Sequence, residues 1–238
     1  MAYNLQGIVR KSTVNITTEF DRLAYSAQNL ANINTTGYKA VRFEDVIDAD
    51  GSVHGYERTD VGSGEFYLTK NPLDVAIQGA GYIPVTTPSG EIRYTRDGSF
   101  TVNKDGMLIT KNGDLVGSGI HIDGSAEKTE IKPNGDVYTY KKVTDKPEYV
   151  GTIPVVQFQN PEALKDAGAN EFIATENSGE MKLVEDHTRI KQYGIEKANV
   201  DIMSEVLAVS RINASILASA KLMKTVNTMY QEAINLTQ

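Results

Sequence analysis

Both ends of this 238-residue chain carry an apolar residue at every seventh position, and no other feature of the sequence constrains the fold as much. Residues 4–33 contain no proline and one glycine, and residues 200–236 contain neither. A seven-residue apolar repeat lines one face of a helix, and such a face packs against another helix. The sequence therefore predicts a long helix at each end, with Asn199 or Asp201 capping the second. The predicted assembly residues along the two apolar stripes are Val9, Ile16, Phe20, Leu23, Leu30, Ile202, Val209, Ile216, Met223 and Tyr230.

The segment between the two helices carries the turn signals of a β domain. Asp-Gly and Asn-Gly pairs tolerate the positive φ angles of tight hairpin turns, so each pair predicts a reversal between two strands. Residues 151–158 are predicted to form a further strand, in which Pro154 indicates an edge position or a bulge. The spacing of the turns favours an antiparallel sandwich or a barrel-like domain. The predicted turns lie at residues 97–98, 103–106, 112–113 and 134–135.

We therefore expect an α+β fold, mostly β at its centre, with long terminal helices that pack in a coiled-coil-like axial layer. The predicted helical domain is discontinuous and comprises residues 1–37 with 196–238, and the predicted β domain comprises residues 38–195. Ser, Thr and Asn flank the apolar stripes, so either helix alone buries little apolar surface. This favours a filament subunit, in which stripes of many copies bundle together, over a helical hairpin within one chain.

Composition and local motifs argue against several other functions. The net charge of −7 and the lack of a basic run disfavour nucleic acid and anionic membrane surfaces as partners. No cysteine is present, and the three histidines show no metal spacing. Residues 48–51, Asp-Ala-Asp-Gly, resemble the start of a calcium loop, but Val53 and Thr59 stand where that loop needs Gly and Glu, which favours a polar turn. We expect no catalytic residues, no cofactor, no metal, no membrane insertion and no cleaved signal peptide.

A specific resemblance begins at the end of the first predicted helix. The segment Ser26-Ala-Gln-Asn-Leu-Ala-Asn-Ile-Asn-Thr-Thr-Gly-Tyr-Lys39 resembles the N-terminal motif of the flagellar rod and hook proteins. In physical terms, the asparagines can end the helix by bonding nearby backbone, and Gly37 allows a sharp exit. The residues that carry this motif are Asn29, Leu30, Ala31, Asn32, Asn34, Thr35, Gly37, Tyr38 and Lys39.

Further segments resemble the same family, in the order in which the family has them. They lie at residues 64–82, 94–100, 150–161, 177–179 and 195–200, and Ala198 stands where members usually have Ser. One such match is weak evidence, but several in order across nearly the whole chain are specific. The motif residues of the central segments are Pro72, Leu73, Asp74, Gly79, Gly81, Tyr94, Arg96, Asp97 and Gly98.

The resemblance implies a structural subunit of the bacterial flagellar basal-body rod, located across the periplasm. Such a subunit is expected to polymerise with its own copies and other rod and hook proteins into a hollow shaft, which transmits torque and serves as an export channel. The resemblance also implies export through the flagellar type III export apparatus. The short link between Lys39 and Gly64 favours a proximal over a distal rod subunit, since distal rod proteins tend to have a longer segment there. Two alternatives remain. One is a distal rod subunit, whose motif core resembles residues 32–39, and the other is a non-flagellar β binding domain with a helical dimerisation stalk.

Overall fold

The computed structural model describes residues 5–47, 49, 53–144, 146–184 and 189–236, so Asp48, Asp50 and Gly51 of the predicted polar turn lie outside them. Contacts divide the chain into two compact units. The helical unit comprises residues 1–31, 41–59 and 200–238, and the β unit comprises residues 32–40 and 60–199. The fold thus has mixed helix and strand content, with a helix near each end and a β-rich centre, as expected. The predicted domain boundaries at residues 37 and 196 remain a prediction.

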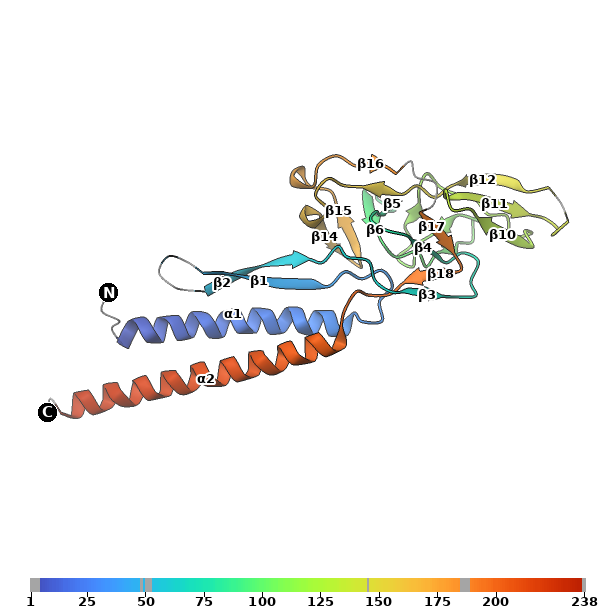
Figure 1. Cartoon of the computed structure of the whole chain (residues 1–238). Coiled ribbons are helices and arrows are strands. Elements are labelled where there is room, and N and C mark those ends of the chain that lie inside the picture. The colour runs from blue at the N-terminus through green and yellow to red at the C-terminus, as the bar shows by residue number, and fades with distance from the viewer. Residues whose placement is uncertain (1–4, 48, 50–52, 145, 185–188, 237–238) are drawn as a thin grey trace. The chain divides into compact units, whose positions relative to one another are not determined.

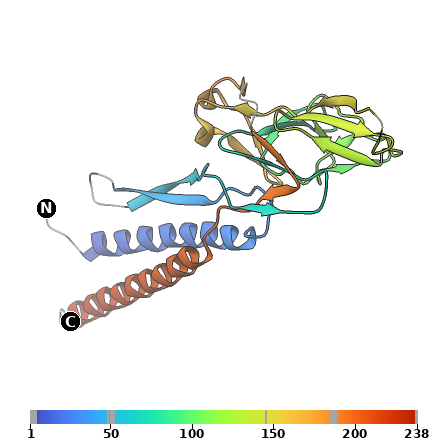
Figure 2. The same ribbon diagram turned by 45° about the vertical axis from the view of Figure 1, so that its right-hand side comes forward.

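The helical unit has three layers. Helix α1 (Leu5–Ala31) lies between helix α2 (Ile202–Asn235) and the hairpin of β1 (Val41–Ile47) and β2 (Val53–Thr59) (Figures 1 and 2). The two helices are antiparallel. Of the two predicted caps, Asp201 begins α2, since its carboxylate accepts a hydrogen bond from the Met203 amide at 3.1 Å.

The β1–β2 hairpin packs on α1 through aromatic and ionic contacts. The rings of Tyr25 and Phe43 stack with centroids 5.7 Å apart, and Arg22 forms an ion pair with Asp45. The hairpin therefore belongs to the same compact unit as the helices.

The β unit is built from antiparallel pairs. Its largest sheet has seven strands in the order β14-β15-β6-β5-β9-β8-β7, and a second sheet has the order β10-β11-β12. Three two-stranded pairs, β13-β16, β17-β4 and β18-β3, complete the pairing within the described residues. The strands are β3 (Phe66–Leu68), β4 (Val75–Ile77), β5 (Ile83–Thr86), β6 (Ile92–Thr95), β7 (Thr101–Val102), β8 (Leu108–Ile109), β9 (Leu115–Val116), β10 (Lys128–Ile131), β11 (Asp136–Tyr140), β12 (Glu148–Thr152), β13 (Val156–Gln157), β14 (Lys165–Gly168), β15 (Glu171–Ile173), β16 (Lys182–Leu183), β17 (Ile190–Gln192) and β18 (Gly194–Glu196). Short 3₁₀ turns span Pro161–Ala163 and Glu176–Ser178.

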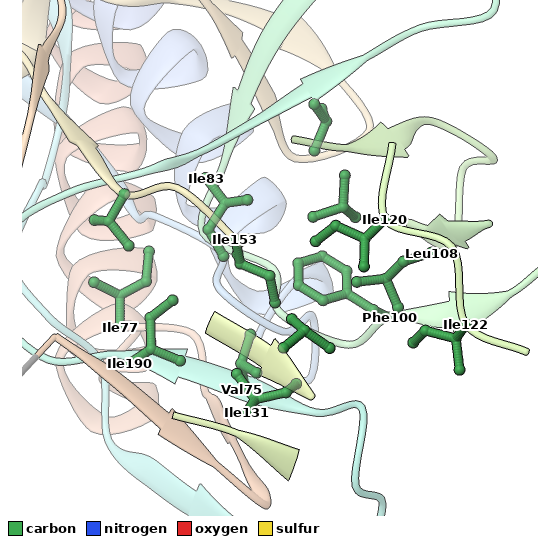
Figure 3. Packing of buried hydrophobic residues seen from close by; sticks show 14 residues of the cluster. Val75, Ile77, Ile83, Phe100, Leu108, Ile120, Ile122, Ile131, Ile153 and Ile190 are labelled. Carbon is green, nitrogen blue, oxygen red and sulfur yellow. The ribbon is translucent and has the colours of Figure 1, made fainter. Parts of the chain in front are cut away.

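Two clusters of buried side chains form the core of the β unit. Strands β5 and β11 alternate buried and half-buried residues, as expected when one face of a strand points inward. Figure 3 shows Phe100 and Leu108 among isoleucines from several strands, and Ile83, Ile153 and Val75 are likewise fully buried. A second, aromatic cluster contains Tyr82, Tyr94, Phe158, Leu164, Val156 and Phe172. These clusters give the unit the rigidity to hold its polar groups in fixed places.

Three of the four predicted turns join paired strands. The turns at residues 103–106, 112–113 and 134–135 connect β7 to β8, β8 to β9 and β10 to β11. The predicted hairpin at Asp97-Gly98 is wrong, because β6 and β7 do not pair and lie apart in the seven-stranded sheet. Gly98 instead serves a close approach: its carbonyl accepts a hydrogen bond from the Val75 amide, and a Cβ there would lie 1.9 Å from the Val75 oxygen.

The predicted strand over residues 151–158 is two strands. β12 ends at Thr152, and β13 begins at Val156 in a different sheet. Pro154 lies between them, where its missing amide hydrogen costs no ladder bond.

Candidate assembly surfaces and their buried anchor

The β unit contains a buried carboxylate between two buried cations. The Oε1 atom of Glu196 accepts a hydrogen bond from the Lys39 ammonium at 2.6 Å, and its Oε2 atom accepts from the Arg96 Nη2 at 2.5 Å. Each of these three residues is about 3% exposed. Buried charges are stable only when paired and hydrogen-bonded, and here each has several partners.

The remaining hydrogen bonds of this triad join motifs that are separate in the sequence. The Nη1 atom of Arg96 donates to the carbonyls of Gly79 and Gly81 at 2.8 and 2.7 Å. The Gly37 amide donates to the Glu196 carbonyl at 2.7 Å. The family-like segments around residues 37, 79 and 96 therefore meet at one point. Glu196, the residue that holds them together, was not among the predicted site residues.

Neighbouring motif residues have structural roles in the same unit. Tyr38 is buried, and the carboxylate of Asp74 accepts from the Asn71 amide group. Just after α1 ends, the Oδ1 atom of Asn32 accepts from the Thr35 hydroxyl at 3.1 Å, which is a contact between side chains. The predicted bonds from the asparagines to nearby backbone stay a prediction. Tyr94 lies in the aromatic cluster, Leu73 packs against the main core, and Asp97 caps its own turn through the Ser99 amide.

Gly37 has the positive φ angle that the sequence predicts, and its position is also crowded. Its φ is +68°, and a Cβ there would lie 2.5 Å from the carbonyl carbon of Arg96. We expect Gly37→Ala to lower the free energy of unfolding of the β unit by more than about 3 kcal/mol, the sum of left-handed strain and a backbone clash.

Gly90→Ala is the matched control for this change. Its φ is +85°, but a Cβ there meets nothing within 4 Å, so only the strain of about 1–2 kcal/mol applies. Both changes are measured by urea unfolding. Equal losses in the two variants would show that the contact of Gly37 with Arg96 carries no weight.

Burial shifts the pKa values of Lys39 in the triad and of Tyr82, which the charges of Arg96 and Glu196 influence. Desolvation lowers the pKa of the Lys39 ammonium below its ordinary value of 10.5, helped by the Arg96 charge and opposed by Glu196. The unfolded chain therefore binds more protons there, so this lysine's contribution to stability rises with pH up to 10.5. Burial raises the pKa of the Tyr82 hydroxyl from 10.0 to about 12. The contribution of Tyr82 to stability depends on pH in the opposite direction, because the folded chain holds this proton more tightly. It is lost as pH rises from 10 to 12.

This difference predicts the alkaline behaviour of a Tyr82→Phe variant. Between pH 9.5 and 11.5 the wild type should lose up to about 2 kcal/mol more unfolding free energy than the variant, since one pKa unit corresponds to about 1.4 kcal/mol. Lys39 and the other tyrosines are common to both proteins and cancel in the comparison. Urea unfolding at the two pH values measures it, and parallel losses would contradict the assigned burial of the Tyr82 hydroxyl.

In the helical unit, α1 meets α2 partly through polar side chains that lie outside the predicted apolar stripes. The Nδ2 of Asn15 donates to the Ser219 hydroxyl at 2.9 Å, and the Ser215 hydroxyl donates to Glu19 at 2.7 Å. Asn29 is 2% exposed and donates to Glu205 at 2.7 Å, while its amide group also exchanges hydrogen bonds with the backbone of Val41. Asn15 and Asn29 are two heptads apart, and Glu19 lies four residues after Asn15. Because these residues are polar, a search for apolar residues alone does not find this repeat.

The predicted apolar stripes are left partly uncovered. Phe20 and Ile202 are 55% and 56% exposed. The other predicted assembly residues are only partly buried, and they are Val9, Ile16, Leu23, Leu30, Val209, Ile216, Met223 and Tyr230. The buried apolar residues of α2 are Ile212 and Val226, and neither belongs to the predicted assembly residues.

Helix α2 exposes further apolar side chains around much of its circumference. Exposed members include Met203, Val206, Leu207, Leu217, Leu222, Met229 and Ile234. By length and composition alone, α2 is the one described helix that could cross a membrane, with 6% of its most apolar window buried. An apolar surface of this extent marks a site that another surface covers.

Among the described residues no group of three His, Asp or Glu side chains is placed to hold a metal ion. A groove of about 530 Å³ lies between α1, β1 and α2, and charges of both signs line it, including Glu19, Arg22 and Arg211. The geometry, with long helices that expose apolar sides and a rigid β unit, is that of a structural protein made for assembly.

Comparison with known proteins gives the family. The chain is 32% identical to the flagellar basal-body rod protein FlgG of Caulobacter vibrioides, over 86% of this chain and 89% of that protein. It is 30% identical to FlgG of Borreliella burgdorferi, over 88% and 91%, and 28% identical to the rod protein FlgF of Mesorhizobium japonicum, over 90% of each. Residues 76–139, within the β unit, match the flagellar hook protein FlgE/F/G D1 domain. The chain belongs to the flagellar rod and hook protein family, whose rod members are structural proteins of the basal body.

Proposed function

We propose that this chain polymerises through its two terminal helices into the hollow shaft of the flagellar rod. The observation that carries the proposal is the exposure of apolar stripes along both helices. Phe20, Ile202 and Leu217 are more than half exposed in the single chain. In a layer of helices from many copies such side chains become buried, and about 25 cal/mol is gained for each square ångström of apolar surface removed from water.

The β unit has a different part in this proposal. Its core and its buried triad form without help from the exposed apolar side chains of the helices. It is therefore suited to form the outer wall of the shaft, while the helices surround a central channel through which later subunits are exported. Torque passes along such a shaft because the β units are rigid and the helical layer is continuous.

Within the rod we keep the proximal position as the proposal. The link from Lys39 to Gly64 is short, and in the structure it is occupied mainly by the β1–β2 hairpin. Export through the flagellar type III apparatus, assembly with other rod and hook proteins, and a location across the periplasm follow from the same proposal.

Deletion of the gene, with electron microscopy of isolated basal bodies, tests the proposed function. Loss of swimming with truncated rods is the expected result, and a rod cut near its base supports the proximal position. A rod cut near the hook would assign the chain to the distal segment. Intact rods and normal swimming would contradict the proposal, and a discrete dimer of the purified chain would then favour a binding domain with a helical stalk. Recovery of the chain in the membrane fraction would assign the apolar side of α2 to lipid.

A further inference from the structure

The polar contacts between α1 and α2 lie along one heptad seam. On α1 the buried polar residues Ser12, Glu19, Ser26 and Asn29 follow this spacing, and Asn15 lies on the same face. Thr18 is also buried, and its hydroxyl donates to the Val14 carbonyl within α1. On α2 the facing residues repeat at intervals of three and four, and those that receive the polar contacts are Glu205, Ser215 and Ser219. We call these contacts the polar seam.

The polar seam has partners in one register only. In the observed antiparallel pair Asn15 faces Ser215 and Ser219, Glu19 faces Ser215, and Asn29 faces Glu205. A slide of α2 by one heptad, ~10 Å along the axis, would bring Leu222 and Val226 to Asn15. A slide in the other direction would bring Ala208 and Ile212 there.

The same slide removes the partners of the other two groups. Glu19 would face Leu222 or Ala208, and Asn29 would face Ile212 or a residue before the start of α2. Each buried amide or carboxylate would then lack its hydrogen bond to α2, which is costly. The apolar stripes cannot discriminate in this way, because every seventh residue is apolar in both helices.

The polar seam is also connected to the third layer of the helical unit. Arg22 contacts Glu19 at 3.4 Å and forms an ion pair with Asp45 of β1, so one chain of polar contacts runs from Ser215 through α1 to the hairpin. Asn29 likewise bonds both Glu205 and the backbone of Val41. The register of α2 is thus fixed relative to β1 as well as to α1.

We propose that the polar seam selects the partner and register of the helix pair, so that α1 pairs with α2 of its own chain in one alignment. Polar residues at seam positions fix register in coiled coils at some cost in stability. The apolar stripes are then left for a second copy of the chain. This last consequence rests on the proposed function, whereas the selection itself is a property of the single chain.

Disulfide trapping in the purified full-length chain tests this proposal, because the chain contains no native cysteine. Thr13 and Met223 are in contact across the two helices, outside the polar seam, with 3.7 Å between hydroxyl and sulfur. The pair T13C/M223C reports the observed register. The pairs T13C/I216C and T13C/Y230C report slides by one heptad in either direction, and a dimeric product reports exchange between chains.

With the seam intact, T13C/M223C should oxidise within one chain at least about tenfold more than the shifted pairs. Adding Asn15→Leu and Glu19→Leu should reduce this preference about tenfold or more, since the shifted registers then place leucine against apolar residues. Thr17→Leu with Asp21→Leu is the matched control, with the same four-residue spacing on the exposed side of α1, and it should retain the preference.

An unchanged preference in the N15L/E19L background, with helix content intact by circular dichroism, would overturn the proposal. So would equal trapping of all three pairs with the seam intact. If the double change lowers helix content, Asn15→Leu alone is measured by the same criteria. The assay needs no rod, so its failure is separate from a failure of the deletion experiment.

Discussion

Replacing Glu196 with glutamine is expected to lower the free energy of unfolding of the β unit by about 3–5 kcal/mol, because the change leaves Lys39 and Arg96 as uncompensated buried charges. The side chains of all three residues are at most 4% exposed, so water cannot replace the lost partner. Urea unfolding followed by tyrosine fluorescence measures the loss, since the β unit contains the buried Tyr38, Tyr82 and Tyr94.

Two further variants make this result specific. Glu65→Gln removes an exposed carboxylate that lies 3.7 Å from Lys197, and it should change stability by less than about 0.5 kcal/mol. Lys39→Met should cost less than the Glu196 change, because it leaves the Arg96–Glu196 pair intact and removes the ammonium, whose charged form burial disfavours. A loss below about 1 kcal/mol for Glu196→Gln would show that the triad does not hold the unit together.

Ile216→Asp is expected to abolish rod assembly and swimming while leaving the β unit folded. Ile216 lies on the apolar stripe of α2 and is only partly buried in the single chain, so the charge is tolerated before assembly. In a packed helical layer the same carboxylate loses its water, at a cost of several kcal/mol in every subunit. Motility in soft agar and counts of complete basal bodies measure the effect, and Leu23→Asp on α1 should behave alike.

Thr225→Asp is the control on the same helix. Thr225 is exposed and lies four residues after Lys221, which can pair with the new carboxylate. Cells with this variant should swim. Normal swimming of the Ile216→Asp strain would contradict the assignment of the apolar stripes to subunit packing, whatever the behaviour of the control.

The sequence predicts the helices and turns of this protein better than the contacts between residues that are far apart in the chain. The two helices and three of the four predicted turns depend on local patterns, namely apolar periodicity and Asn-Gly or Asp-Gly pairs, and these were found. The pairing of Glu196 with Arg96 and with Lys39 joins residues 100 and 157 positions apart, and no local pattern encodes it. The available signal was a charged residue, Lys39, Arg96 or Glu196, in each of three family-like segments.

The polar seam shows a different reason for a missed site. Counting apolar residues identifies the stripes, but Asn15 and Glu19 follow the same period with polar side chains, so this count passes over them. Asn29 enters the prediction only as a family motif residue. The hairpin predicted at Asp97-Gly98 is wrong for a third reason. Glycine occurs both in tight turns and where two backbone segments approach closely, and the local sequence does not distinguish these roles.

One side chain at the base of the β1–β2 hairpin bears on how rod and hook proteins diverge in length. Asn199 accepts from the Ala40 amide at 2.7 Å and donates to the Asp60 carbonyl at 2.8 Å, and the Asp60 amide itself donates to the Ala40 carbonyl. The chain thus enters the hairpin at residue 40 and leaves it at residue 60, and hydrogen bonds hold these two positions together. Insertions or deletions between these positions leave both flanking strands of backbone where they were. An insertion that keeps the contacts of β1 with α1 can therefore lengthen this excursion without redesigning the rest of the subunit.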